Sequence, residues 1–533
     1  MACTEDGRFL GLGHSQGLSV WCASSFTRVA EWLQPRLEVT FIQITRMAEM
    51  TYLLGTVDDM GVSRVFGLHS GVIHLLSAIN IMEGVNKRSI VVTFDLHEGG
   101  RYGAASLSCN GAVWLEVYQF PVEAWLRELE VAPSQKKEKN ASEGSDVKWS
   151  PVTLMIKIFP PTVPAGKTSD FLTSCLALDI IRSSRHQETQ ESPSSCTQHF
   201  LLPCDQSTGG SRARPGLPVA VAVWWSGSHN ILQYSLQKAP NDGRDVTPLP
   251  EMLWPNAKEI LCSAVSRCTC YIALGLEDAL VCIWNRQSGA PLSIVLAPEG
   301  SSPLSRVQFV DSWPVSAQDC HIAPTKPVGG LVSSKNGAIY TVTTGQGMQS
   351  CTMQLIERPK DSRDLPTVTM TLPFLQAVSL VVQRSGKMFL KDVLDRSTVC
   401  YLTPPSSYRI ASPYNPVYAL NAKQRALFIR GDPETDCHDL SRKGNQSRLF
   451  VFYFDQSDIF KPHFLSHVDP PRQQTTLCHG SLEEICNLYL EQRAHSADER
   501  NKALVQTWGK LQESAAGMQQ TPQSHKHLKN YNI

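Results

Sequence analysis

The chain has 533 residues, and its 49 Lys and Arg are balanced by 49 Asp and Glu. This zero net charge argues against a general electrostatic attraction to nucleic acid or to anionic lipid, so we expect neither as a partner. No apolar run approaches the roughly 18 residues that cross a bilayer, and Met1–Asp6 lacks the basic and apolar blocks of a secretory signal. We therefore expect a cytoplasmic protein whose 16 Cys are reduced.

The first recognisable unit is a hairpin that runs from Phe9 to Trp21, with its turn at Gly17. Gly11, Gly13 and Gly17 imitate the fingerprint of a dinucleotide-binding loop, but their spacing is one residue off. A strand also follows where that motif needs a helix. Glycines that permit turns explain the three positions better.

Similar hairpins follow at intervals of roughly 40–60 residues, which is the period of β-propeller blades. The second ends on Phe66, and the clearest later copy runs from Tyr271 through Gly275 to Trp284. Each unit can bury its faces only between neighbours, so several must close into a ring. Hairpins are recognisable near residues 9, 52, 104, 223, 272, 332, 380 and 427, and a degenerate copy is expected in 150–182.

These repeats predict a mostly β fold, a propeller of seven or eight degenerate blades. Fewer blades with a second sheet unit would also fit the count, and a stack of unrelated β-sandwiches is the structural alternative. Three segments interrupt the repeat, near residues 133–150, 182–218 and 432–447. Their polar, Ser-rich or Gly-rich composition favours surface insertions in loops, where binding usually occurs.

Gly166-Lys167-Thr168 follows a predicted strand and resembles the end of a P-loop. Pro161 stands where that motif needs its first Gly, and the neighbouring prolines remove backbone N–H donors that would bind phosphate. Nucleotide binding by an enzyme through this degenerate loop is therefore kept only as an alternative.

Metal sites need converging ligands, such as paired C-x₂-C elements. The sequence contains no C-x-x-C, no G-x-S-x-G nucleophile elbow and no H-E-x-x-H motif. We predict no metal, no cofactor and no catalytic residues, and hence a protein that is not an enzyme. Three Cys-His pairs are adjacent in the sequence, and on a strand the two side chains of each would point to opposite faces: Cys320-His321, Cys437-His438 and Cys478-His479.

The C-terminal part changes character after a linker predicted at 466–480. Capping boxes that begin at Ser481 and Ser496 predict helical structure over 481–515. The remaining residues, 516–533, are polar and are expected to be a disordered tail.

Leu504, Trp508 and Leu511 fall on one face of the predicted C-terminal helix. Such an apolar face either packs back against the propeller or contacts a partner. We take these three residues as the candidate partner contacts.

The hairpins resemble WD repeats. Gly13-His14 is a Gly-His pair, and Trp21 and Trp284 stand where the Trp of the repeat belongs. No Trp-Asp dipeptide occurs, so the resemblance implies that the Asp/His/Ser/Trp hydrogen-bond set is incomplete in most blades. The structural repeat positions that we assign are Gly13, His14, Trp21, Phe66, Gly275 and Trp284.

The resemblance covers roughly residues 2–460 and implies a WD40-like β-propeller over residues 1–465, with a C-terminal helical extension. Rings of this family usually close by pairing an N-terminal strand with the last blade. This chain begins at the turn before Phe9. We therefore expect either a shortened form with an incompletely closed ring or a ring that is closed differently.

Over its whole length the sequence resembles a divergent WD-repeat member that is associated with cilia and flagella. This resemblance implies a non-catalytic scaffold that binds other proteins in the ciliary or flagellar axoneme. The alternative is a substrate receptor or scaffold in a ubiquitin ligase or in another cytoplasmic regulatory complex.

Overall fold

The fold consists mainly of β-strands. The computed structural model describes residues 1–80, 89–138, 148–161, 195–204, 216–237, 248–256, 258–298, 302–310, 327–345, 350–433, 447–464 and 505.

The strands of these residues form eight four-stranded antiparallel sheets, each made from consecutive strands of the chain. The first four sheets consist of β1 (Ala2–Cys3), β2 (Phe9–His14), β3 (Gly17–Cys22) and β4 (Arg28–Leu33); β5 (Val39–Ala48), β6 (Thr51–Asp58), β7 (Ser63–His69) and β8 (Val72–Ala78); β9 (Ile90–Leu96), β10 (Tyr102–Cys109), β11 (Ala112–Gln119) and β12 (Thr153–Ile158); and β13 (Cys196–Leu201), β14 (Ala220–Trp225), β15 (Asn230–Ser235) and β16 (Met252–Pro255).

The last four sheets continue the same order. They consist of β17 (Ile260–Val265), β18 (Tyr271–Leu276), β19 (Leu280–Asn285) and β20 (Ala290–Leu296); β21 (Leu304–Val310), β22 (Val328–Ser334), β23 (Ile339–Thr344) and β24 (Cys351–Ile356); β25 (Pro366–Thr371), β26 (Val378–Gln383), β27 (Met388–Asp392) and β28 (Thr398–Leu402); and β29 (Tyr408–Ile410), β30 (Tyr418–Asn421), β31 (Ala426–Pro433) and β32 (Arg448–Tyr453).

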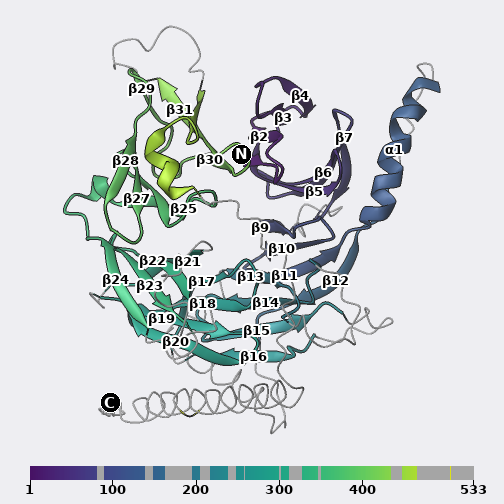
Figure 1. The fold of residues 1–533 in the computed structure, drawn as a ribbon. Helices are drawn as coiled ribbons and strands as arrows, with labels where there is room; N and C mark the ends of the chain where they lie inside the picture. Colours follow the sequence, from purple (N-terminus) through teal and green to yellow (C-terminus); the bar gives the residue numbers. More distant parts are fainter. Residues whose placement is uncertain are drawn as a thin grey trace, which may run out of the picture.

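The eight sheets follow one another around a central axis, which makes the fold an eight-bladed β-propeller (Figure 1). The core is divided into eight apolar clusters, and each lies between two neighbouring sheets. Each sheet is therefore covered on both faces, which explains why middle strands such as β6 and β14 are buried along their whole length. The predicted fold class is confirmed, with eight blades.

The ring closes by packing the first sheet against the last one. Leu10 and Ala23 share an apolar cluster with Ala419, Ala426 and Phe428.

A polar contact joins the same two sheets. The buried Asn421 side chain donates through Nδ2 to the carbonyl oxygen of Gly7 at 2.9 Å. Gly7 adopts a φ of 71°, and a Cβ there would lie 2.4 Å from Asn421 Oδ1, so only glycine fits this contact.

The eighth sheet is only three strands wide. β29 pairs with residues 431–433 of β31, while β30 pairs with residues 426–429 of the same strand. β32 pairs with residues 426–431, so it occupies the opposite side of β31. The inner position of this blade is thus divided between two short strands, and β32 is its outermost strand among the described residues.

One long helix, α1 (Val122–Glu138), interrupts the third sheet between β11 and β12 and lies at the edge of the ring (Figure 1). Its Trp125 and Leu129 are completely buried in the cluster between the second and third sheets. The Trp125 indole also donates to the carbonyl oxygen of Ser150 at 2.8 Å. Three short 3₁₀ segments complete the described elements: η2 (Glu277–Ala279), η4 (Ser362–Asp364) and η5 (Asp458–His463).

Two of the predicted irregular segments contain regular structure. Residues 133–138, expected in a solvated loop, continue α1 to its end at Glu138. The degenerate repeat expected in 150–182 is not a separate blade in its described part, because β12 there is the outer strand of the third sheet. β13, inside the predicted insertion at 182–218, is the inner strand of the fourth sheet.

Candidate protein-interaction surface

One face of the ring carries the features most suited to binding. In every antiparallel blade, the start of the inner strand, the turn between the two middle strands and the end of the outer strand lie on the same face. Two cavities open there, one between the second, third and fourth sheets and the other between the sixth and seventh. The first is apolar and the second is basic.

The first cavity, here called the apolar groove, has a volume of about 490 Å³. Phe41, Ile90 and Val92 line it and expose 41%, 52% and 50% of their surface. Large apolar side chains exposed next to one another on a ring face are typical of a protein-binding site. Its lining consists of Thr40, Phe41, Val57, Asp58, Asp59, Gly61, Ile90, Val91, Val92, Thr93, Phe94, Asp95, Cys196, Thr197 and Gln198.

The groove also has an acidic side. Asp58 is held by an ion pair with Arg64 and by the backbone N–H of Val62 at 2.8 Å. Asp59 is exposed beside it. Acidic groups next to an apolar floor favour an amphipathic basic segment over an acidic one.

Asp95 lies deeper in the groove. Burial raises the pKa of its carboxyl group, and a hydrogen bond from Gln198 Nε2 at 2.6 Å opposes this effect.

The apolar groove also contains a thiol, that of Cys196, which is a weak nucleophile. Burial raises the pKa of the Cys196 thiol to about 11, although a contact with the Ser106 hydroxyl at 3.3 Å opposes the rise. The thiol is therefore protonated at neutral pH and reacts poorly.

Sequence reasoning missed Phe41, Ile90 and Val92. They lie in the inner strands β5 and β9, outside the hairpins that the repeat predicts, and an apolar residue in a strand gives no signal in the sequence that it is exposed. The groove also combines residues that lie up to 158 positions apart, such as Thr40 and Gln198. Only the ring brings them together.

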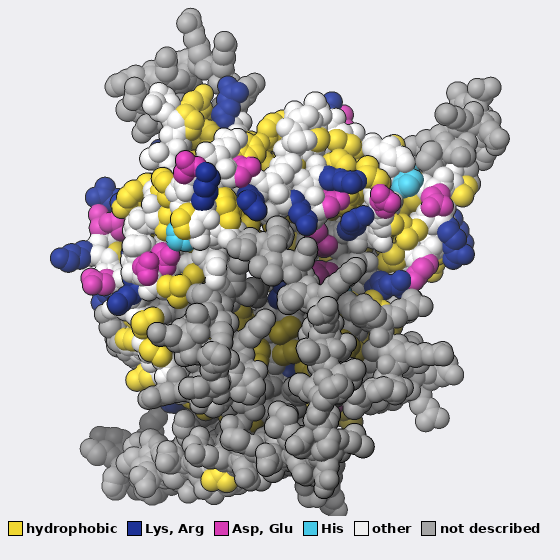
Figure 2. All heavy atoms as spheres, in the orientation of Figure 1, with side chains coloured by type: hydrophobic (Ala, Val, Ile, Leu, Met, Phe, Trp, Pro, Cys, Tyr) yellow, Lys and Arg dark blue, Asp and Glu magenta, His cyan; other side chains and the backbone are white. Residues whose placement is uncertain are grey.

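The rest of the described surface is mixed. On the face shown in Figure 2, hydrophobic, basic and acidic side chains are interspersed over the first, second and last sheets. This distribution agrees with the balanced charge of the chain.

The predicted repeat positions of the first blade are placed by the structure as follows. Gly13 lies in β2 against the second sheet, and a Cβ there would be 2.6 Å from the Val39 carbonyl oxygen. His14 ends β2, and its Nδ1 accepts a hydrogen bond from the backbone of Gln16 at 3.3 Å. The Trp21 indole in β3 donates to Ser19 within the same strand at 2.9 Å.

Phe66 and Gly275 both serve packing between blades. Phe66 is completely buried and meets Trp32 edge to face, with ring centroids 4.8 Å apart. A Cβ on Gly275 would lie 2.5 Å from Cys262 Sγ and 3.2 Å from Leu304, which belongs to the next sheet.

Trp284 shows how one blade is stabilised without a Trp-Asp pair. Its indole donates to Asn256 Oδ1 at 3.2 Å. The Asn256 amide in turn donates to the carbonyl oxygens of His229 and Trp254, both at 3.1 Å. Asn256 lies in the segment that connects the fourth sheet to the fifth, and it thus joins this segment to Trp284 in the fifth sheet. Asn80 has the same position after the second sheet and donates to Gly61 at 2.9 Å.

Several sequence predictions lie outside the described residues. These are the candidate partner contacts Leu504, Trp508 and Leu511, and the loop Gly166-Lys167-Thr168. Across the described ranges, no three His, Cys, Asp or Glu side chains are grouped so that they could hold a metal ion. None of the described helices has the length and apolar character that crossing a membrane requires.

Comparison with known proteins gives one family and many solved structures. The family model described as WD repeat-containing protein 93 matches residues 1–179 and 177–281. Sqt1 of Saccharomyces cerevisiae is similar over 85% of this chain and 92% of that one, with a TM-score of 0.46 and 10% identity. The computationally designed protein Ika8 is similar over 84% and 93%, with a TM-score of 0.43 and 12% identity. Raptor of Chaetomium thermophilum gives a TM-score of 0.36 at 11% identity and covers 80% of this chain and 26% of that one.

Proposed function

The chain belongs to the WD repeat-containing protein 93 family, and from this premise we propose that it is a non-catalytic scaffold that assembles other proteins in the axoneme of cilia or flagella. The family and the propeller fold support a protein-interaction scaffold. The axonemal location extends the whole-chain resemblance described above, and it is the part that needs a direct test.

The apolar groove is the observation that carries the scaffold function. A rigid ring holds Phe41, Ile90 and Val92 next to one another, so a partner meets a preformed surface and little conformational entropy is lost on binding. The acidic edge at Asp59 selects the charge of that partner. We propose that the bound segment presents apolar side chains flanked by Lys or Arg.

Affinity capture from extracts of motile cilia tests both parts of the proposal. The tagged wild-type protein should capture tubulin-associated axonemal proteins, and the double variant Ile90→Lys with Val92→Lys should lose them. Leu154→Lys with Leu296→Lys is a matched control, because these two side chains are 44% and 57% exposed on outer strands away from the groove. Capture of cullin adaptors instead would favour the ubiquitin-ligase alternative.

The location has its own readout. The tagged protein should distribute along motile axonemes in intact cells. A uniform cytoplasmic distribution in ciliated cells would contradict the axonemal role and would leave the scaffold function open to test by capture.

We also propose that Leu504, Trp508 and Leu511 contact a partner, as their spacing in the sequence suggests. Trp508→Glu should then abolish an interaction while the midpoint of thermal unfolding stays nearly unchanged. A large fall of that midpoint would instead assign these residues to the core of the protein.

A further inference from the structure

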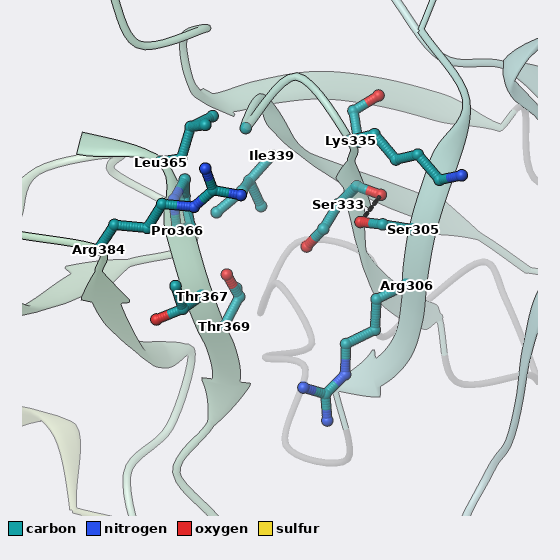
Figure 3. A pocket seen from close by; sticks show the side chains of 12 residues that line it. Ser305, Arg306, Ser333, Lys335, Ile339, Leu365, Pro366, Thr367, Thr369 and Arg384 are labelled. Atoms are coloured by element: carbon teal, nitrogen blue, oxygen red, sulfur yellow. Dashed lines mark hydrogen bonds between the residues drawn. The ribbon is translucent and has the colours of Figure 1, made fainter. Parts of the chain in front are cut away.

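The second cavity, here called the basic pocket, lies between the sixth and seventh sheets and has a volume of about 350 Å³ (Figure 3). Its walls come from the starts of β21 and β25 and from the turns that follow β22 and β26. It therefore opens on the same face of the ring as the apolar groove, but it is built from other blades.

Three cationic side chains line the basic pocket: Arg306, Lys335 and Arg384. In the described part of the chain, none of them forms an ion pair. Arg384 lies over the Tyr414 ring at 5.8 Å, and because the ring has no net charge, this contact does not neutralise the guanidinium. Among the described residues, no acidic side chain lines the pocket. The chain has equal numbers of acidic and basic residues, so an excess of basic residues in the composition does not explain this group of like charges.

Two acidic residues that precede β25 do not change this charge. Asp361 is paired with Arg363 at 3.0 Å. Asp364 is exposed and is not part of the pocket wall.

Hydroxyl groups complete the pocket. Thr369 is only 6% exposed, lines the pocket and finds no hydrogen-bond partner among the described residues. The Ser333 hydroxyl also has no partner within the described ranges and lines the same wall. In Figure 3 both side chains lie between Arg384 on one wall and Arg306 on the other. Neither oxygen is among the buried side-chain atoms that lack a partner, so both are open to the cavity and available to a polar ligand.

The other three hydroxyls of the lining bind backbone carbonyl groups and so stabilise the walls. Ser305 Oγ donates to the Ser333 carbonyl oxygen and Thr367 Oγ1 to the Val382 carbonyl oxygen, both at 3.1 Å. Ser334 Oγ donates to the Ser302 carbonyl oxygen at 3.3 Å.

The two turns that carry the cations are fixed before any ligand arrives. The backbone N–H of Lys335 donates to Pro303 at 2.9 Å, and that of Arg384 donates to Leu365 at 3.0 Å. Gly337 has a φ of 90°, and a Cβ there would lie 2.6 Å from Leu365, so the first turn packs directly on the seventh sheet. Because the backbone is already fixed, only the cationic side chains need to be ordered when an anion binds.

From these observations we propose that the basic pocket binds the phosphate group of a phosphoserine or phosphothreonine in a partner protein. A phosphate monoester carries close to two negative charges and three acceptor oxygens, which suits a cavity lined by three cations and by two hydroxyls that have no partner among the described residues. A carboxylate would leave part of this set unused. The proposal depends on the proposed scaffold function and names the chemistry of one class of partner.

The shape of the pocket favours a peptide over other phosphate-bearing molecules. Ile339, Leu365 and Pro366 form an apolar wall on which the residues flanking a phosphoserine would pack. Three cations border one small cavity, whereas nucleic acid needs a basic stripe and anionic lipid needs a broad basic surface.

The test measures binding of fluorescein-labelled peptide libraries to the full chain by anisotropy. One library carries a fixed phosphoserine with degenerate flanks, and the other carries serine in its place. The wild type should bind the phosphorylated library at least about tenfold more tightly. Arg306→Gln with Arg384→Gln should remove this preference, and Thr369→Val, which keeps the shape of the side chain, should reduce it. Arg267→Gln should have no effect, since it removes one exposed charge from a turn on the opposite face.

The outcomes separate the alternatives. Equal affinity for both libraries, or a preference that the Arg306 and Arg384 substitutions leave intact, overturns the proposal. So does binding to single-stranded RNA or to vesicles containing phosphoinositides with no peptide preference. If the phosphopeptides fail while partner capture remains sensitive to Ile90 and Val92, the scaffold function stands and only the phosphate site is lost.

Discussion

At the scale of single residues, the spacing between neighbouring sheets depends on glycines that have no room for a side chain. Gly13→Ala would place a methyl group 2.6 Å from the Val39 carbonyl oxygen and 2.8 Å from Val39 Cγ1. The second sheet would have to move, so we expect the free energy of unfolding to fall by about 1–3 kcal/mol.

Gly330→Ala is the matched control, because it also lies in a strand and its new methyl group would be 3.5 Å from the nearest atom, the Gln308 carbonyl oxygen. This variant should change the free energy of unfolding by less than about 0.5 kcal/mol. Denaturant titration of both variants makes the comparison. Equal losses would show that close approach of the backbone is not what requires Gly13.

A single histidine also gives the fold a pH dependence. Burial lowers the pKa of His199 to about 4, and its Nε2 is 2.7 Å from the Ser263 hydroxyl. The ring is therefore neutral in the folded protein, while the unfolded chain takes up a proton near pH 6.5. The stability that this residue contributes is present above pH 6.5 and is lost as the pH falls toward 4.

His199→Gln keeps a hydrogen-bonding group near Ser263 and cannot titrate. The difference in free energy of unfolding between wild type and variant should fall by about 2 kcal/mol from pH 7 to pH 4.5. Chemical denaturation at a series of pH values measures it. Parallel curves for the two proteins would mean that His199 is protonated in the folded state as readily as in the unfolded one.

The residues that the sequence revealed are those that repeat. Trp284 and Gly275 recur at the blade period, so a pattern identifies them. Asn80, Asn256 and Asn421 are buried and donate hydrogen bonds to backbone carbonyl groups, but no local sequence pattern identifies them. An isolated asparagine in a sequence is as typical of a solvated turn as of a buried hydrogen bond.

At the scale of elements, α1 contributes to the core between the second and third sheets. Trp125 stacks on Phe120 with ring centroids 5.6 Å apart and is completely buried. Trp125→Ala should lower the free energy of unfolding by about 3–5 kcal/mol, because it leaves a large cavity and an unpaired Ser150 carbonyl group.

Val131→Ala in the same helix is the control, since Val131 is 52% exposed. We expect it to change the free energy of unfolding by less than about 0.5 kcal/mol. Similar small effects for both variants would show that the helix can detach without loss to the core.

The two middle strands of each blade could be predicted and most of the others could not. Strands such as β6 and β18 are apolar, buried on both faces and joined to their partners by short turns, so each hairpin is visible in the sequence. Inner and outer strands are shorter or half exposed, as in β1 and β12. The helix could not be predicted for a different reason: the spacing of Val122, Trp125 and Leu129 is helical, but the segment lies inside a blade, where the repeat predicts only strands.

At the scale of the whole molecule, stability depends on every blade having two neighbours. A chain ending at residue 403 would lack the eighth sheet and would expose the clusters around Leu10 and Leu380 at once. We expect it to aggregate and to bind hydrophobic dyes. A chain ending at residue 465, which keeps all eight sheets, should retain its far-UV circular dichroism and a cooperative unfolding transition. A soluble, cooperative shorter chain would contradict the mutual support of the blades.

Periodicity could predict a ring of seven or eight blades, and the number eight required the pairing of strands in space. Neither cavity could be predicted from the sequence, for the same reason. The basic pocket joins Arg306 to Arg384, and nothing in either local sequence shows that the two positions face each other across neighbouring sheets.

The first and last sheets share no strand within the described residues, and their junction consists of side-chain packing with the single bond from Asn421 to Gly7. Tension applied across this seam would pull two surfaces apart, whereas a strand shared by both blades would have to be sheared along a row of backbone hydrogen bonds. The propeller therefore has a mechanical weak point at one known place. Under mechanical load, the orientation of the molecule relative to the force would decide whether the ring opens at this seam.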